Sequence, residues 1–266
     1  MGASSLREEE YELKDGDRMK PITGQTQTNP SESSTHTAGA RIVLMGPPGA
    51  GKGSISERLA DKFGMVHLSS GDILRAERSS GSELGETLKK YMDAGELVPD
   101  EIVIKIIIKS ISSLDSSKGL LLDGFPRTVI QAKQLDDALA KAGLPIQAVL
   151  LLDAPEEVLL KRITGRRICP KCGRVYHIET MPPAKDNICD TCGTKLIHRD
   201  DDTEQVVRER INLYHKETEP VIEYYRKSGV KIIEVNADAT IDEVVERAIE
   251  GIRQANLLEK EGRTSL

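Results

Sequence analysis

The chain has 266 residues, of which 38% are hydrophobic and 30% charged, enough to form one large core or two modest ones. The net charge of −6 excludes a chain-wide positive field for nucleic acid or anionic membranes. With no Trp and only two Phe, surfaces that stack nucleic-acid bases are not expected either. No apolar run reaches the ~20 residues that a membrane-spanning helix needs, and no secretory signal layout is present. Any phosphate-binding site must therefore use local basic residues.

Residues 1–40 are rich in Ser, Thr, Glu, Gly and Gln and predict a disordered tail, because they cannot bury enough apolar surface to offset the entropy of ordering. Four glutamates at positions 8, 9, 10 and 12 argue against an organelle transit peptide. Cytoplasm is the default location, with mitochondrion and plastid left open.

From Arg41 onward, short apolar runs alternate with segments of helical periodicity. Strands are expected at 41–45, 119–123, 148–153 and 230–235, and helices at 52–63, about 72–79, 84–93, 100–112, 128–141, 155–163, 203–227 and 240–255. Such alternation predicts a parallel sheet with helices on both faces, a three-layer α/β sandwich. Residues 164–202 break the rhythm with Gly, Pro and paired Cys, which indicates an insertion with its own small structure. Residues 256–266 are predicted to be a C-terminal tail.

The first strand runs directly into GPPGAGKGS (46–54), and a helix follows. A glycine-rich string in this setting is typical of a phosphate-binding loop, whose backbone N–H groups approach the phosphates at a helix N-terminus. Lys52 is expected to reach the β- and γ-phosphates. Gly53 stands where the general motif has Ser or Thr, and the hydroxyl comes one residue later at Ser54. A glycine-rich turn without a ligand is the alternative.

Four cysteines form two C-x-x-C pairs, CPKC (169–172) and CDTC (189–192). Two such pairs predict a tetrahedral four-thiolate site of the structural zinc type, with no open position for catalysis. Two disulfides or free thiols are the alternatives, and the spacing does not distinguish zinc from iron. His177 and His198 lie nearby and are interpreted as ordinary polar residues. A metal would supply folding free energy to a segment with little apolar content.

The phosphate loop resembles that of the adenylate kinase family, which carries Gly after the Lys and then a hydroxyl residue. The likeness continues through SSGDILR (69–75), SGSELG (80–85), MDAGELVPDE (92–101), LDGFPRT (122–128), RITGRR (162–167), GRVYH (173–177), RDDD (199–202) and YHKETEPVIEYY (214–225). It spans residues 41 to about 255. Ser54 departs from the more usual Thr, and Ile55 from the Gln of many members.

The resemblance implies a P-loop nucleoside-triphosphate-hydrolase-like core, with a helical NMP-binding domain at 69–98 and a zinc-bearing lid at 165–202 inserted into residues 41–255. It implies an ATP site of Gly49, Ala50, Gly51, Lys52, Gly53, Ser54, Arg162, Val175 and Tyr176. The implied AMP site comprises Ser70, Arg75, Glu96, Leu97, Val98, Gly124, Phe125, Pro126, Arg127, Gln131, Arg199 and Arg210. The implied catalytic cations are Lys52, Arg127, Arg162, Arg166, Arg199 and Arg210, and the expected zinc ligands are Cys169, Cys172, Cys189 and Cys192.

These residue types suit phosphoryl transfer, which needs two nucleotides held in line and positive charge around the moving group. Because the AMP phosphate is already anionic, no general base is assigned. Asp123 is predicted to hold Mg²⁺ through water. The expected reaction converts ATP and AMP into two ADP under a lid that excludes water, with lid opening limiting turnover. A monomer is expected.

Three other functions share some of these features. A zinc-ribbon nucleic-acid-binding protein would also have two C-x-x-C pairs, but the acidic charge opposes it. A regulatory GTPase or ATPase switch shares the phosphate loop but needs an N-K-x-D type motif, which is absent from the sequence. A UMP or CMP kinase is the nearest enzymatic alternative, although those usually have a short lid. GTP in place of ATP stays open.

Overall fold

The computed structural model describes residues 39–93, 96–115 and 117–257. At its centre lies a sheet of β1 (Arg41–Met45), β2 (Val66–Ser69), β3 (Leu120–Asp123), β4 (Ala148–Asp153) and β7 (Lys231–Asn236). The strands lie in the order β2-β3-β1-β4-β7, and every neighbouring pair is parallel. The predicted parallel α/β sheet is confirmed.

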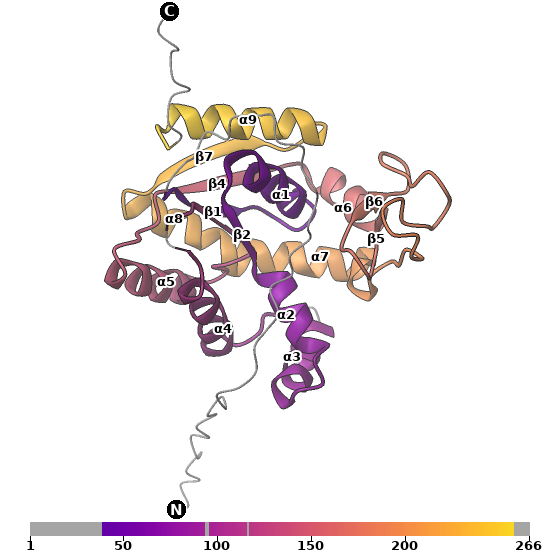
Figure 1. Ribbon diagram of the computed structural model, residues 1–266, viewed down its shortest axis with the longest axis horizontal. Coiled ribbons are helices and arrows are strands. Elements are labelled where there is room, and N and C mark those ends of the chain that lie inside the picture. The colour runs from indigo at the N-terminus through magenta and orange to yellow at the C-terminus, as the bar shows by residue number, and fades with distance from the viewer. Residues whose placement is uncertain (1–38, 94–95, 116, 258–266) are drawn as a thin grey trace, which may run out of the picture. The chain divides into compact units, whose positions relative to one another are not determined.

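Helices cover both faces of this sheet (Figure 1). On one face lie α1 (Lys52–Phe63) and α9 (Ile241–Gln254), and on the other α4 (Asp100–Ser112), α5 (Val129–Lys141) and α8 (Glu219–Lys227). One buried apolar cluster joins the sheet to α1, α9 and α6 (Glu156–Thr164), and a second joins it to α4, α5 and α8. Both faces of the strands are thus buried, as their continuous apolar runs predict.

Helix α9 illustrates how the sequence specifies its elements. Thr240 and Glu243 form a reciprocal capping box at its start, which satisfies backbone N–H groups that have no helical partner. Val244, Ala248 and Ile252 follow at four-residue spacing and are buried against the sheet. The cap fixes where the helix begins, and the spacing fixes which face it buries.

Two features differ from the expected elements. Strand β2 was not predicted, because VHLS is short and half polar. The long helical stretch expected at 203–227 is divided into α7 (Glu204–Leu213), a π-helical segment (Tyr214–Thr218) and α8. The π segment ends just before Pro220, which lacks the N–H that a continuing helix would use.

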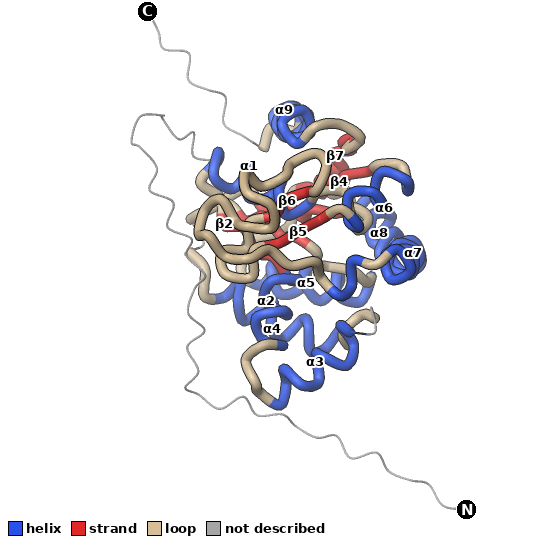
Figure 2. The backbone as a smooth tube through the Cα atoms, turned by 90° about the vertical axis from the view of Figure 1, so that its right-hand side faces the viewer, coloured by secondary structure: helices blue, strands red, loops and turns tan. Residues whose placement is uncertain are grey.

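Residues 70–93 form α2 (Ser70–Arg78) and α3 (Glu83–Asp93), within the range predicted for NMP binding. Residues 166–177 form an antiparallel hairpin of β5 (Arg166–Ile168) and β6 (Val175–His177), within the predicted lid. A short 3₁₀ turn (Asp200–Asp202) leads to α7. The lid has its own small core, formed by Cys169, Tyr176, Cys189 and Leu196. Figure 2 shows these lid strands and loops from the side.

The predicted N-terminal tail lies outside the described residues except for Gly39 and Ala40, and Ala40 is buried in the core. Of the predicted C-terminal tail, only Asn256 and Leu257 are described. No helix among the described residues is both long and apolar enough to cross a membrane.

The topology also locates the site. The chain runs from β1 to β2 and β3 on one side of it and then crosses to β4 and β7 on the other, so the order of the strands reverses at β1. In open parallel sheets, ligands bind at the carboxyl ends of the strands at such a switch point. The glycine-rich loop after β1 occupies this position.

Candidate active site and metal centre

The loop between β1 and α1 has the backbone of a phosphate-binding loop. Gly46, Gly49 and Gly51 have φ values of 146°, 87° and 89°, which favour glycine. A Cβ on Gly46 would lie 2.4 Å from the Leu152 carbonyl oxygen, so the loop also packs too closely for a side chain. Gly51 caps α1 without any side-chain hydrogen bond. The first N–H groups of α1 therefore have no side-chain cap and can bind an anion.

Lys52 bends back over this loop. Its Nζ donates to the carbonyl oxygens of Gly46 at 2.7 Å and Pro47 at 2.9 Å. Burial lowers the pKa of Lys52 to about 8, with Asp123 opposing the shift and nearby arginines adding to it. The ammonium of Lys52 is thus held over the loop in surroundings that disfavour its charge. A bound phosphate would stabilise the charged amine.

Asp123, the last residue of β3, places its carboxylate beside the phosphate loop. It is 8% exposed, and a Cβ on Gly53 would lie 3.8 Å from its Oδ2. His67 on β2 places its Nε2 3.5 Å from the same oxygen. A buried carboxylate beside the start of α1 fits a Mg²⁺ ion that keeps most of its water. No motif in the sequence predicts His67 at this position.

Several of the predicted arginines lie near one another and near Lys52. Burial is the main cause that lowers the pKa of Arg127 and of Arg199 to about 10 each. The positive charges of neighbouring arginines contribute as well: Arg210 and Arg75 for Arg127, and Arg75 and Arg166 for Arg199. Cations crowded together in this way, at a cost in free energy, indicate a site that binds polyanions.

Arg162 has different surroundings. Its Nη2 donates to the carbonyl of Ala239 at 2.9 Å, and the charged residue that affects its pKa is Asp238. This places its guanidinium at the loop between β7 and α9.

Acidic residues that the sequence analysis left without a role hold two of the arginines. Asp202 is fully buried and accepts from Arg166 Nε at 2.9 Å and Nη2 at 2.6 Å. Arg210 donates to Asp201 at 2.9 Å and lies 3.7 Å from Asp202. Such paired bonds fix the plane of the guanidinium. The RDDD string was recognised as a motif, but its aspartates could not be assigned partners from the sequence.

Several of the predicted AMP residues lie at the turn after β3. Ser70 Oγ donates to the Gly124 carbonyl at 2.7 Å, and Arg127 Nε donates to the same oxygen at 2.8 Å. Arg75 pairs with Asp72 at 2.5 Å. Phe125 is buried, and a cis peptide joins it to Pro126. The segment Glu96, Leu97 and Val98 leads into α4, with Val98 buried.

Gln131 is held in one orientation. Its Oε1 accepts from the Arg127 backbone N–H at 2.7 Å, and its Nε2 donates to Asp100 Oδ1 at 2.8 Å. The other oxygen of Asp100 accepts from Thr128 Oγ1 at 2.8 Å. Since the amide has two donors and two lone-pair acceptors, one N–H and one acceptor remain for a ligand. Asp100 is a further residue that sequence reasoning missed.

The four cysteines come together, with all four sulfurs within 4.8 Å of one another. The Sγ–Sγ distances are 3.4 Å for Cys169–Cys192, 3.5 Å for Cys172–Cys189 and 3.7 Å for Cys172–Cys192. Tetrahedral zinc with bonds of ~2.3 Å would separate its sulfurs by about 3.8 Å, so this donor set fits such an ion.

The pKa values of the thiols also indicate that four thiolates here would need a bound cation. A hydrogen bond from the Tyr176 hydroxyl is the main cause that lowers the pKa of Cys189 to about 6. At Cys172 a backbone N–H favours the thiolate, but desolvation and the other three sulfurs outweigh it and raise the pKa to about 12. Neighbouring thiolates repel, and a divalent ion removes that repulsion.

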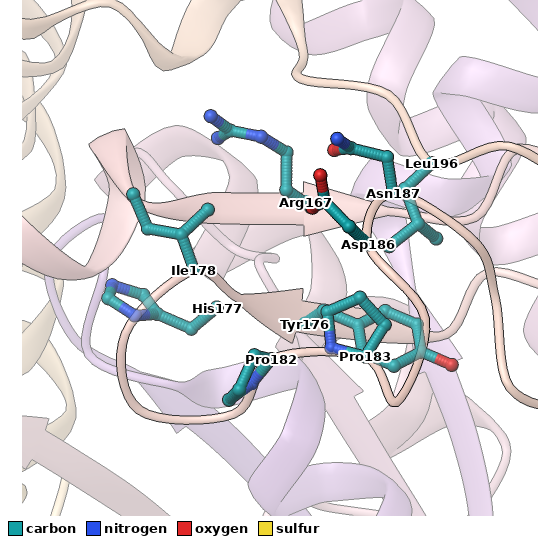
Figure 3. Close-up of a pocket in the computed structure, with 9 residues that line it drawn as sticks. All are labelled: Arg167, Tyr176, His177, Ile178, Pro182, Pro183, Asp186, Asn187 and Leu196. Atoms are coloured by element: carbon teal, nitrogen blue, oxygen red, sulfur yellow. The ribbon is translucent and has the colours of Figure 1, made fainter.

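The predicted ATP residues Val175 and Tyr176 lie on β6. Val175 is partly exposed, whereas Tyr176 is 2% exposed and directs its hydroxyl to Cys189 and Asp190. A cavity of about 240 Å³ lies in the lid beside Arg167, Tyr176 and Ile178 (Figure 3). His177 uses Nδ1 to accept from the backbone of Glu179 and Thr180, so this residue holds the turn that follows β6.

A phosphate loop at the switch point of a parallel sheet, with basic residues converging on it, defines the class of P-loop nucleotide-binding proteins. A family model described as adenylate kinase matches residues 44–230. The chain is 49% identical over 216 residues to an adenylate kinase of Petrotoga mobilis, an alignment that covers 81% of this chain and 99% of the relative. It is 47% identical to that of Streptomyces coelicolor, covering 80% and 99%, and 50% identical to that of Archaeoglobus fulgidus, covering 71% and 87%.

The chain belongs to the adenylate kinase family. It is therefore an enzyme of the transferase class, a nucleoside monophosphate kinase, as the sequence analysis predicted.

Proposed function

We propose that the chain reversibly transfers the terminal phosphoryl group of Mg-ATP to AMP, giving two molecules of ADP, and so balances the adenine nucleotides. The observation that carries this proposal is the convergence of Lys52 with Arg127, Arg166 and Arg210, whose charges affect its pKa, in a member of the adenylate kinase family. Such a cluster of cationic side chains is suited to bind two polyphosphates that face each other.

On the ATP side, the backbone from Gly49 to Ser54 would surround the phosphates, and Lys52 would leave its carbonyl partners to bind them. Ser54 and Asp123 would hold Mg²⁺, Asp123 through water, and the ion would offset charge on the β- and γ-phosphates. The Val175–Tyr176 segment would contact ATP from the lid side, and Arg162 would leave the Ala239 carbonyl to reach the phosphates. Because the Tyr176 hydroxyl is engaged within the lid, its backbone is the part left for a nucleotide.

On the AMP side, Arg75, Arg127, Arg199 and Arg210 would bind the phosphate. Ser70, Gln131, the Glu96–Val98 backbone and the Gly124–Pro126 turn would position the nucleoside. The remaining N–H and acceptor of Gln131 match the N1 acceptor and N6 donor of adenine, which supports AMP as the acceptor.

The reaction itself requires little covalent chemistry from the protein. An AMP phosphate oxygen attacks the γ-phosphorus as the bond from that phosphorus to the β–γ bridging oxygen breaks, and the electron pair leaves with ADP. No proton has to be removed from the nucleophile. Lys52, Arg127, Arg162, Arg166, Arg199 and Arg210 would stabilise the negative charge spread over the transferred group.

We further propose that Cys169, Cys172, Cys189 and Cys192 bind a structural zinc ion. The short sulfur separations support this proposal. Four protein ligands leave no coordination position for a substrate, so the ion would stabilise the lid and take no part in phosphoryl transfer.

A coupled assay of ADP formation tests the activity. The metal-loaded protein is expected to form ADP from ATP with AMP as acceptor, and to use GMP, UMP and CMP poorly. No ADP from ATP and AMP would overturn the proposal, and faster reaction with UMP or CMP would reassign the acceptor. Metal analysis of the purified protein tests for zinc, and iron in its place would correct the identity of the ion.

We also propose that the enzyme works as a monomer in the cytoplasm, without nucleic acid or membrane partners. The net charge of −6 supports the absence of nucleic-acid and anionic-membrane partners. Light scattering after gel filtration, cell fractionation and filter binding with DNA and RNA test these points in turn.

A further inference from the structure

Tyr176 occupies an unusual place for a residue expected at a nucleotide. It lies in the middle of β6, four residues after the first C-x-x-C pair, and its side chain is almost completely buried in the lid core. Its ring helps to line the lid cavity shown in Figure 3. The hydroxyl does not reach solvent, so it must find its hydrogen-bond partners inside the lid.

Both partners of this hydroxyl belong to the second C-x-x-C pair. The Asp190 backbone N–H donates to the Tyr176 oxygen at 2.8 Å, and the Tyr176 hydroxyl lies 3.4 Å from Cys189 Sγ. A backbone N–H can only donate, so it occupies an acceptor position of the oxygen and leaves the hydroxyl proton for the sulfur. Cys189 is 1% exposed, which prevents water from solvating its thiolate. Tyr176 supplies a donor that solvent cannot.

A second link from the same strand region reinforces this contact. The guanidinium of Arg174 lies 5.4 Å from the centre of the Tyr176 ring, and its Nη1 donates to Thr191 Oγ1 at 2.7 Å. Thr191 lies between Cys189 and Cys192. Arg174 thus restrains the ring against the second pair. Its positive charge also opposes the negative charge of about two units that four thiolates around a divalent ion would carry.

We propose that Tyr176 is a positioning residue of the metal centre, which holds Cys189 in place and stabilises its thiolate through the hydroxyl. This inference rests on the proposed four-cysteine site and extends it beyond the ligands. Groups that hydrogen-bond to metal ligands fix ligand geometry, and their loss typically lowers metal affinity 10–100-fold. The phenol hydroxyl, and not only the apolar ring, is therefore required in the lid.

The Tyr176→Phe variant tests this inference, because it keeps the ring and removes only the hydroxyl. Zinc affinity measured by competition with a chromogenic chelator is expected to fall about 10-fold or more. The cobalt-loaded protein gives a second readout, its sulfur-to-cobalt charge-transfer absorption. Loss of a hydrogen bond makes the thiolate a better electron donor, so this band is expected to move to longer wavelength.

Tyr224→Phe is the matched control. The Tyr224 hydroxyl donates to Asp136 at 2.9 Å in the core, away from the cysteines, so its loss is expected to leave zinc affinity and the cobalt band unchanged. Equal affinity and identical spectra for Tyr176→Phe and wild type would overturn the inference while leaving the zinc site intact. A wild-type chain that binds neither zinc nor cobalt would overturn the metal site itself, and the ADP assay reports on the proposed reaction separately.

Discussion

At the scale of single residues, the pKa of Lys52 predicts how ATP binding depends on pH. Burial lowers this pKa to about 8 in the nucleotide-free site, whereas a bound phosphate favours the charged amine and raises it. Above pH 8 binding must take up a proton, so affinity falls as pH rises. We expect ATP affinity to drop about 30-fold between pH 7 and pH 9.5, if the bound amine stays protonated.

Isothermal titration of ATP across this pH range gives the measurement. The Lys52→Met variant should bind ATP more weakly at pH 7 and lose the pH dependence, and its kcat/KM should fall about 100-fold or more. A wild-type affinity that stays constant up to pH 9.5 would contradict the assigned role of the amine.

Asp100 predicts how the acceptor base is selected. The Asp100 carboxylate and the Arg127 N–H together fix which end of the Gln131 amide carries oxygen. Adenine needs one order of donor and acceptor, and hypoxanthine needs the reverse. Because Asn can donate as well as accept, Asp100→Asn should raise the KM for AMP about 10-fold and reduce the preference for AMP over IMP. The KM for ATP should not change.

Steady-state kinetics with AMP and IMP at saturating ATP provide this test. Asp115→Asn, a change at an exposed residue after α4, serves as the control and should behave as wild type. An Asp100→Asn variant with unchanged selectivity would show that Gln131 does not depend on this carboxylate.

Some site residues belong to short contiguous motifs, whereas others come from segments that are far apart in the sequence. The phosphate loop and the cysteine pairs are contiguous motifs, so sequence alone predicted their geometry, and the structure brings each set together. The arginines come from distant segments and could be assigned only through the family likeness. Asp100 and Asp202 could not be found in this way, because an acidic residue in a polar stretch looks like an ordinary solvated side chain until the fold supplies its partners: Gln131 for Asp100 and Arg166 for Asp202.

At the scale of elements, polar residues also explain why strand β2 was not predicted from the sequence. The strands β1, β3 and β4 are mostly apolar, and β7 has six residues that include Ile232, Ile233 and Val235. Strand β2 has only four residues and carries His67 and Ser69 at the edge of the active site. Polar residues placed for a site weaken the pattern that identifies a strand. The π segment between α7 and α8 was likewise hidden, because its residues are as compatible with an α-helix as with a wider turn.

At the Asp200–Asp202 turn, we expect one buried ion pair, between Asp202 and Arg166, to contribute strongly to stability. Asp202 is fully buried and holds Arg166 by two hydrogen bonds, with Arg210 3.7 Å away. Removing one partner of a buried ion pair leaves an uncompensated charge. Asp202→Asn should therefore lower the free energy of unfolding by ~3 kcal/mol, measured by urea denaturation.

The neighbouring Asp200→Asn substitution removes the same charge from an exposed side chain and should change stability by less than ~0.5 kcal/mol. Equal stability of the two variants would mean that the Arg166 pair contributes little. A selective loss at Asp202 would confirm that the acidic run is part of the structure and not a solvated surface.

At the scale of the whole molecule, we expect catalysis to depend on moving the lid cations to and from the phosphates. The lid hairpin joins the core at Gly165, where a Cβ would lie 2.3 Å from His177 Nε2 and the Ile178 N–H donates to the Gly165 carbonyl. Closure has to exclude water from the γ-phosphate, and the products can leave only after the lid opens. Since opening breaks many charged contacts at once, we expect it, and not bond formation, to limit turnover.

Relaxation-dispersion measurements with both nucleotides bound should give an opening rate equal to kcat within a factor of about two. The Gly165→Ala variant sharpens the comparison, because the added methyl group must displace His177 at the root of the lid without backbone strain. Opening rate and kcat should change by the same factor in this variant, while the KM for AMP stays constant. If opening were far faster than turnover, or if Gly165→Ala changed one rate without the other, the chemical step would be limiting.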